Sequence, residues 1–193
     1  EFGLELSAHT ENIDLGPKVT STEILFNCRS RNVEVVGTRL KPNTKYYVFM
    51  ENVDVTNWCV PKLLPITMNR GTFATQDIIT TAGVAALVLG QPDITFRAAQ
   101  INHKFGAFNN PTEKYLTEPY SKTALTSSYS STSNVLNVDT FDLSDFRRAE
   151  RLGYVTKGMV LANKTGTAEA VVNELSLMSD ESGNLIFSLH IPD

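Results

Sequence analysis

The sequence predicts a mainly β protein: an antiparallel β-sandwich, immunoglobulin-like or related, with one short helix and a long loop insertion. Three segments carry this prediction. Apolar and polar residues alternate over residues 32–37 and again over 185–191, which is the period of a strand with one buried face. Residues 46–50 form a run of aromatic, β-branched and other apolar side chains that suits a strand.

The first unit, residues 28–55, reads as a strand, a corner and a second strand. Residues 40–44 turn the chain, because Pro42 fixes φ and has no N–H to donate, while Asn43 tolerates turn geometry. Trp58, the only tryptophan of the chain, follows this unit, and we expect it to anchor the core beneath the corner. Pro61 and Pro65 should then bracket an extended link.

The middle of the chain contains two further predicted strands, at residues 76–81 and 94–98. Residues 82–89 form a short apolar run that periodicity alone leaves open between helix and strand, although Gly83 and Gly90 favour a strand.

Residues 141–152 give the best helical pattern, with Thr140 or Asp142 as the N-terminal cap and Gly153 as the stop. Acidic residues come early and arginines late, which complements the helix dipole. The core-facing stripe of this expected helix comprises Phe141, Leu143, Phe146, Ala149 and Leu152.

The last part of the chain is predicted to be strands again, at residues 155–161 and 168–172, joined by a turn at 163–166. We further expect residues 175–178 to pair with 185–191 as a hairpin across a loop at 179–184. His190 falls on the outward phase of this last strand and is expected to be solvated.

The predicted organisation is an N-terminal arm, residues 1–22, followed by a β-sandwich domain, residues 23–193. The domain carries an inserted irregular region at about 66–154, and the alternative is a division into two small β modules. The chain starts at Glu1 without a methionine, so we interpret it as part of a longer polypeptide.

Residues 102–134 contain aromatic side chains strung among asparagine, proline, serine and threonine. Such a composition is typical of a contact surface, so this region is predicted to bind a protein partner or a sugar. The alternative is a flexible surface loop whose aromatic rings pack against the sheet, and His103 is expected at the surface in either case. The candidate contact residues are Phe105, Phe108, Tyr115, Tyr120 and Tyr129.

Composition argues against two classes of partner. The formal net charge is −4 and the pI is about 5.4, which gives no cationic field for nucleic acid. The longest apolar run, residues 84–89, is far too short to span a bilayer, so no membrane partner is expected. The cysteines Cys28 and Cys59 are expected to be free buried thiols, although the sequence leaves their pairing open.

No catalytic, cofactor-binding or metal site is predicted. His9, His103 and His190 lie far apart in the sequence, with no other ligand at metal-binding spacing. Residues 180–184 lack the spaced acidic ligands of a calcium loop and read as a turn. We therefore expect no enzyme activity. A hydrolase with paired carboxylates stays open as an alternative, because carboxylate separation depends on the fold, but it is the weakest one because the sequence gives no sign of the converging groups that it would need.

Two sets of motifs resemble known proteins. Residues 40–46, Leu-Lys-Pro-Asn-Thr-Lys-Tyr, are similar to the L-x-P-x-T-x-Y corner of fibronectin type III-like and other immunoglobulin-like sandwiches, with Tyr46 at the tyrosine position. The ordered set at residues 29–31, 37–47 and 179–192 resembles virion structural proteins of tailed bacteriophages, which carry R-S-R, then G-L-K-P-N-T and an aromatic strand, then a D-x-x-G segment ending in I-P. This chain departs from that pattern at Thr38-Arg39 and at residues 50–52.

The resemblance implies a structural component of a phage tail, baseplate or fibre, located in the virion after assembly in the host cytoplasm and needing no cofactor. Its partners would be other virion structural proteins, with a homo-oligomer such as a trimer expected. The alternative function is a module that binds a host-surface glycan or receptor through the aromatic residues of 105–129, and a tail-associated hydrolase is the third.

Overall fold

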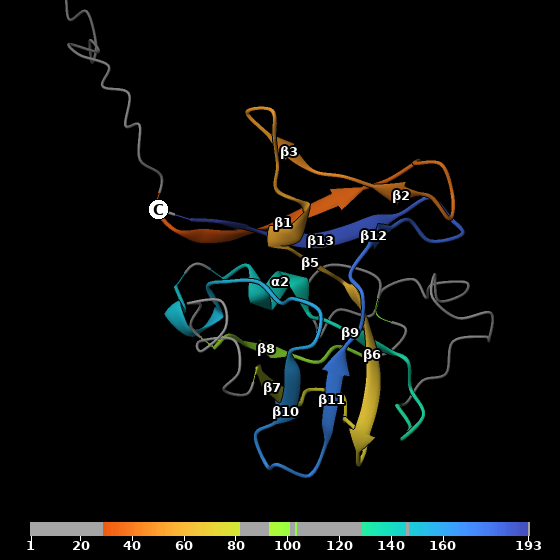
Figure 1. Ribbon diagram of the computed structural model, residues 1–193, viewed down its shortest axis with the longest axis vertical. Coiled ribbons are helices and arrows are strands. Elements are labelled where there is room, and N and C mark those ends of the chain that lie inside the picture. The colour runs from red at the N-terminus through yellow and green to blue at the C-terminus, as the bar shows by residue number, and fades with distance from the viewer. Residues whose placement is uncertain (1–28, 82–92, 101–102, 104–128, 146, 193) are drawn as a thin grey trace, which may run out of the picture.

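The computed structural model describes residues 29–81, 93–100, 103, 129–145 and 147–192, and it contains two β layers (Figure 1). The smaller layer is a three-stranded sheet in the order β1 (Arg31–Gly37), β13 (Leu185–Ile191) and β5 (Cys59–Pro61). A single helical turn, α2 (Thr140–Leu143), lies between this sheet and the larger one.

The larger layer is a six-stranded antiparallel sheet that curls until its two end strands meet. Beyond the ends of these strands, Ala98 and Val138 form an antiparallel bridge, and the Ala99 N–H donates to the carbonyl of Asn137 at 2.8 Å. The strand order is β8 (Thr95–Arg97), β7 (Ile78–Thr81), β10 (Val160–Asn163), β11 (Glu169–Val172), β6 (Leu63–Arg70) and β9 (Val135–Asn137).

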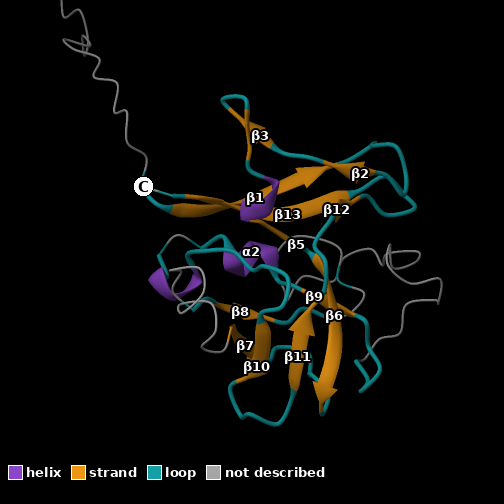
Figure 2. Ribbon diagram, in the orientation of Figure 1, coloured by secondary structure: helices purple, strands orange, loops and turns teal. Residues whose placement is uncertain are grey.

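The remaining elements are short (Figure 2). β12 (Leu177–Met178) pairs with β2 (Lys45–Tyr46), and β3 (Phe49–Met50) pairs with β4 (Val53–Asp54). The part of the chain that the structure describes also contains two 3₁₀ turns, η1 (Thr56–Trp58) and η2 (Ala149–Arg151).

The predicted fold class is confirmed: the protein is mainly β, antiparallel and sandwich-like, and its described residues contain one short α-helix. The predicted strands at 32–37, 76–81, 94–98, 168–172 and 185–191 correspond to β1, β7, β8, β11 and β13. The corner also has the expected geometry, because the Tyr46 hydroxyl accepts a hydrogen bond from the Lys41 N–H at 3.0 Å.

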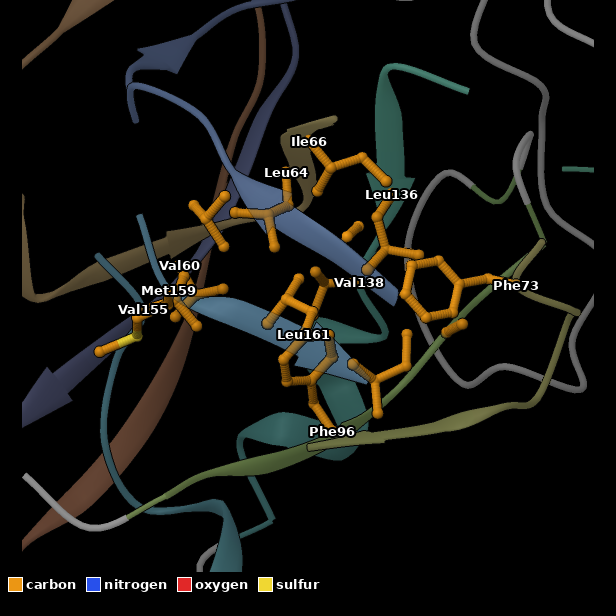
Figure 3. Close-up of a cluster of buried hydrophobic side chains, with 14 of the residues drawn as sticks. Val60, Leu64, Ile66, Phe73, Phe96, Leu136, Val138, Val155, Met159 and Leu161 are labelled. Atoms are coloured by element: carbon orange, nitrogen blue, oxygen red, sulfur yellow. The ribbon is translucent and has the colours of Figure 1, made fainter. Parts of the chain in front are cut away.

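The main core fills the interior of the curled sheet (Figure 3). Leu64, Phe96, Leu136 and Leu161 are wholly buried there and come from four different strands. Each such side chain contributes roughly 1.5–3 kcal/mol through removal of its apolar surface from water. The curled sheet therefore holds most of the apolar burial of the fold.

A second, smaller core lies against the face of the three-stranded sheet that points away from α2, and it contains Cys59, Leu177, Leu185 and Phe187. Cys59 is a free thiol, as predicted, and burial followed by the nearby charge of Asp54 raises its pKa to about 12. Cys28 lies outside the described residues.

The predicted C-terminal hairpin is wrong in its pairing. The turn forms, with the Asp180 N–H bound to the carbonyl of Asn184 at 2.8 Å. Beyond the turn the two strands separate, because β12 pairs with β2 whereas β13 pairs with β1 and β5. The last strand thus lies in the middle of the smaller sheet, and the half-buried His190 contacts Asn32 at 2.9 Å instead of being solvated.

The predicted helix at 141–152 is also wrong beyond its first turn. α2 ends at Leu143, and the cap is Asp139, whose side chain accepts from the Asp142 N–H. Of the expected apolar stripe, Leu143 is buried, but Phe141 is 53% exposed and Ala149 is exposed. The stripe fails because the segment is held by buried polar contacts, and Phe146 lies outside the described residues.

Three further expectations need correction. Trp58 is half-buried on η1 and belongs to neither core. Pro61 and Pro65 do not bracket a link, because they lie within β5 and β6. The expected strand at 155–161 begins only at Val160.

Region 66–154, expected as an irregular insertion, supplies β7, β8, β9 and α2 in its described part. The division into domains stays a prediction, and the arm at 1–22 and the run at 82–89 lie outside the described residues. No helix within the described ranges has the length and apolar character that crossing a membrane requires.

Candidate functional site

A two-stranded hairpin formed by β3 and β4 stands out beyond the three-stranded sheet that contains β1 and β13 (Figure 1). Met50 pairs with Val53, and the two residues between them, Glu51 and Asn52, have φ values of 50° and 67°. Positive φ at both central positions is the geometry of a type I′ turn, whose twist matches that of the strands it joins. The sequence therefore builds a tight, well-defined projection.

The base of the hairpin is fixed to the body of the protein. The Val48 N–H donates to the hydroxyl of Thr56 at 2.9 Å, and the Val55 N–H donates to the carbonyl of Val48 at the same distance. Val55 is buried, with 1% of its surface exposed. These contacts hold the hairpin at its base and leave its strands in solvent.

The hairpin and its approach expose apolar side chains on both faces. Tyr47 is 57% exposed, Phe49 62%, Met50 36% and Val53 58%. Among the large hydrophobic residues in the described part of the chain, only Val36 and Phe141 are exposed to a similar degree elsewhere. Exposed apolar side chains gathered in this way mark a surface that contacts another molecule.

A groove of about 830 Å³ opens beside the base of the hairpin. Four chain segments line it: 45–47, 54–58, 154–157 and 174–175. This size lies within the ~300–1,000 Å³ typical of ligand pockets. The lining residues are Lys45, Tyr47, Asp54, Thr56, Asn57, Trp58, Tyr154, Thr156, Lys157, Glu174 and Leu175.

The charged groups of the groove already have partners. The Lys157 ammonium lies 3.5 Å from the Glu174 carboxylate, and the Lys45 ammonium lies 5.2 Å from the centre of the Tyr47 ring. Thr56 lowers the pKa of Asp54 through hydrogen bonds to its carboxylate; the side chain of Thr56 has the larger effect and its backbone N–H the smaller. The two lysines and the two carboxylates leave the groove close to neutral.

A second candidate is the polar cluster where the chain passes from the smaller sheet to the curled one. Lys62 is the single residue between β5 and β6, and only 1% of its surface is exposed. Its ammonium group donates a hydrogen bond to the carbonyl of Val138 at 3.0 Å. Nearby, the Arg97 guanidinium donates to the buried carboxylate of Asp139 at 2.9 and 2.6 Å. The Thr140 hydroxyl donates to Glu34 at 2.7 Å, which ties α2 to β1.

This polar cluster has the character of a structural site. Burial lowers the pKa of Lys62 to about 8, against the opposing effect of the Asp139 and Glu34 carboxylates. The cavity beside Lys62 measures only about 10 Å³. A water molecule needs roughly 10–15 Å³, so this cavity has no room for a substrate beside Lys62.

The structure places the predicted contact residues as follows. Tyr129 is 8% exposed, lies in the main core and donates its hydroxyl to the carbonyl of Ala99 at 2.6 Å, so its ring offers no surface to a ligand. His103, expected at the surface, is 4% exposed. The other four candidates, Phe105, Phe108, Tyr115 and Tyr120, lie outside the described residues.

No group of three or more histidine, cysteine, aspartate or glutamate residues in the described ranges is arranged to hold a metal ion. The sequence alone did not indicate the hairpin and groove residues as a site, above all Phe49, Val53 and Trp58. One signal could have indicated them: residues 46–50 are apolar without alternation, and Glu51-Asn52 then forms a two-residue link to Val53. A short strand with apolar residues on both faces is either buried on both sides or available for contact.

Comparison of the chain with protein-family models, with curated proteins and with solved structures finds no match.

Proposed function

We propose that this chain is a structural assembly module that binds neighbouring protein chains through the β3–β4 hairpin. The observation that carries the proposal is the exposure of Phe49, Met50 and Val53 on a projection whose base is fixed to the body. An isolated two-stranded hairpin is only marginally stable in water, and apolar burial stabilises it by about 25 cal/mol per Å². A partner that covers both faces of the hairpin would supply this burial.

The setting that we propose is the virion of a tailed bacteriophage, as part of the tail, baseplate or fibre. Support comes from the position of the motifs that carry the resemblance. The corner and the 179–184 turn contact each other, since the Leu40 N–H donates to the carbonyl of Gly183 at 2.9 Å and the Ser179 hydroxyl donates to that of Lys41 at 2.6 Å. Arg31 and Ile191, at the outer ends of the motif set, are paired in register between β1 and β13.

The partner that we propose in the first instance is a further copy of this chain, in a closed oligomer such as a trimer. A stable interface buries roughly 1,200–2,000 Å² in total, more than one hairpin offers. The hairpin would therefore form the apolar centre of the contact, and the neighbouring surface of the smaller layer would form its polar rim. The work of the module would be adhesion between chains, and no chemical step is required.

The experiment is light scattering over a range of protein concentrations on the wild type and on two hairpin variants, Phe49→Asp and Val53→Asp. The expected result is a stable oligomer for the wild type and monomers for both variants. Phe141→Asp is the matched control, because Phe141 is equally exposed but lies on α2. A wild type that stays monomeric at every concentration, or hairpin variants that assemble like the wild type, would overturn the proposal.

A further inference from the structure

The groove beside the hairpin carries hydrogen-bonding groups that the fold does not use. Within the described residues, the Asn57 amide, the Trp58 indole N–H and the hydroxyls of Tyr47 and Tyr154 have no hydrogen-bond partner. These groups include both donors and acceptors, and all of them are uncharged. They are available to a ligand that presents hydroxyl or amide groups.

One aromatic ring of the groove, that of Tyr154, is held in place by a neighbouring ring, and Trp58 lies on a backbone segment that is fixed to the body. The backbone N–H of Trp58 donates to the carbonyl of Val55 at 2.9 Å, and this bond fixes η1 next to the buried Val55. The Tyr154 ring packs against the His190 ring with 5.9 Å between centroids, and His190 is itself bonded to the buried Asn32. A ring held as Tyr154 is loses little conformational freedom when a ligand binds.

The charge of the groove limits the class of ligand. Lys157 faces Glu174, Lys45 faces the Tyr47 ring, and Asp54 accepts from Thr56, so no unpaired charge of one sign is presented. An anionic or cationic ligand would have to compete with these contacts. The complementary ligand is therefore neutral.

We propose that this groove is a binding site for a neutral saccharide. A sugar ring has an apolar face of C–H groups, which suits the flat rings of Trp58 and Tyr154, and a rim of hydroxyls, which suits the Asn57 amide and the indole N–H. A peptide would need backbone N–H or C=O groups in the groove, but the free groups described above belong to side chains. The site differs from the aromatic residues of 105–129, and it does not depend on assembly through the hairpin.

The test uses the intrinsic fluorescence of Trp58, the only tryptophan in the chain, so the signal reports on the groove directly. Cellohexaose, maltohexaose and chitohexaose are titrated into the full chain. The expected result is a saturable change in emission with at least one of them. Asn57→Ala and Tyr154→Ala should each weaken that binding by about tenfold or more, as expected for the loss of a central contact.

Two controls make the test decisive. Phe49→Asp should bind the sugar like the wild type, which separates this site from the assembly surface. Asn57 is exposed and makes no contact that the described fold needs, so Asn57→Ala keeps the test valid if Tyr154→Ala fails to fold. The proposal is overturned if none of the three sugars gives a saturable change, if Asn57→Ala binds with unchanged affinity, or if a proline-rich peptide saturates the signal and the sugars do not.

Discussion

Lys62 provides the sharpest test of how the two layers are joined. Its backbone N–H donates to Ile186 in the smaller layer at 2.9 Å, and its carbonyl accepts from Val138 at the curled sheet at 2.7 Å. The same residue therefore fixes the crossing point of the chain and places an ammonium group in the interior. The perturbation is Lys62→Met, which keeps an unbranched side chain one atom shorter than lysine and removes the charge.

The magnitude follows from the pKa of Lys62, which burial lowers from 10.5 to about 8. Between these values the unfolded chain holds the proton and the folded chain has released it, so the free energy of unfolding rises with pH. The unfavourable effect is fully present below about pH 8 and has vanished above about 10.5. At about 1.4 kcal/mol per pH unit, the wild type gains about 3 kcal/mol relative to the variant across this window.

The assay is urea unfolding of both proteins at a series of pH values, and the quantity compared is the difference between their free energies of unfolding. Other titrating groups are common to both proteins and cancel in this difference. The carbonyl of Val138 also accepts a hydrogen bond from the backbone N–H of Thr140 at 2.9 Å. This carbonyl therefore still has a hydrogen bond after Lys62 is replaced. Lys164→Met, in an exposed turn, is the control and should give a flat difference. Parallel pH profiles for the wild type and Lys62→Met would refute the reasoning.

Three further predictions concern stability. The Cys59 thiol keeps its proton to about pH 12 in the folded chain but releases it near pH 9.0 in the unfolded chain, so the wild type loses stability as the pH rises between these values. Cys59→Ala should remove this loss. Urea unfolding in that pH range measures the effect, and a variant with the same dependence on pH as the wild type would contradict the prediction. Tyr46→Phe should lower the free energy of unfolding by about 1 kcal/mol through loss of the bond to Lys41, with Tyr47→Phe neutral as the control. Asn32→Ala should cost about 3 kcal/mol, because the buried amide donates to two backbone carbonyls at 2.6 and 3.3 Å; a thermal midpoint like that of the wild type would contradict this.

The sequence predicted β1, β7, β8, β11 and β13, but it missed β6 and β9 and did not indicate how the strands pair. The alternation of Leu185, Phe187 and Leu189 correctly indicates the face that packs in the smaller core. Alternation says which face is buried and nothing about the neighbouring strand. β12 pairs with β2 because Ser179, which follows β12, binds the corner at residues 40–44. The backbone N–H of Ser179 donates to the carbonyl of Thr44 at 3.0 Å. This contact joins residues more than a hundred positions apart in the sequence.

The helix prediction failed for a different reason. Residues 141–152 have helical periodicity, but the Asp145 side chain accepts from the Arg147 N–H at 3.2 Å and from its guanidinium at 2.8 and 2.9 Å, which closes a local turn. Arg151 is 3% exposed and pairs with Asp142, so charged groups occupy the interior where the pattern places apolar ones. A buried ion pair of this kind follows from the tertiary fold and is not visible in hydrophobic periodicity.

For the candidate site, the sequence indicated the kind of contact residue but not its place in the chain. The sequence indicated aromatic side chains as the contact groups, but it placed them at 105–129, and Tyr129 is buried in the main core. The groove combines four segments between residues 45 and 175 that only the folded chain brings together. Trp58 lines it because η1 turns the chain just before the buried β5, a local effect that apolar content alone does not specify.

We propose that the chain associates through the β3–β4 hairpin, and hydrogen–deuterium exchange can test this. The exchange of the segment 48–55 is measured at protein concentrations below and above the onset of assembly. We expect the amides of this segment to become protected as the oligomer forms, while those of the β10–β11 turn do not change. Unchanged exchange in the hairpin, with protection appearing on another surface of the assembled protein, would contradict it.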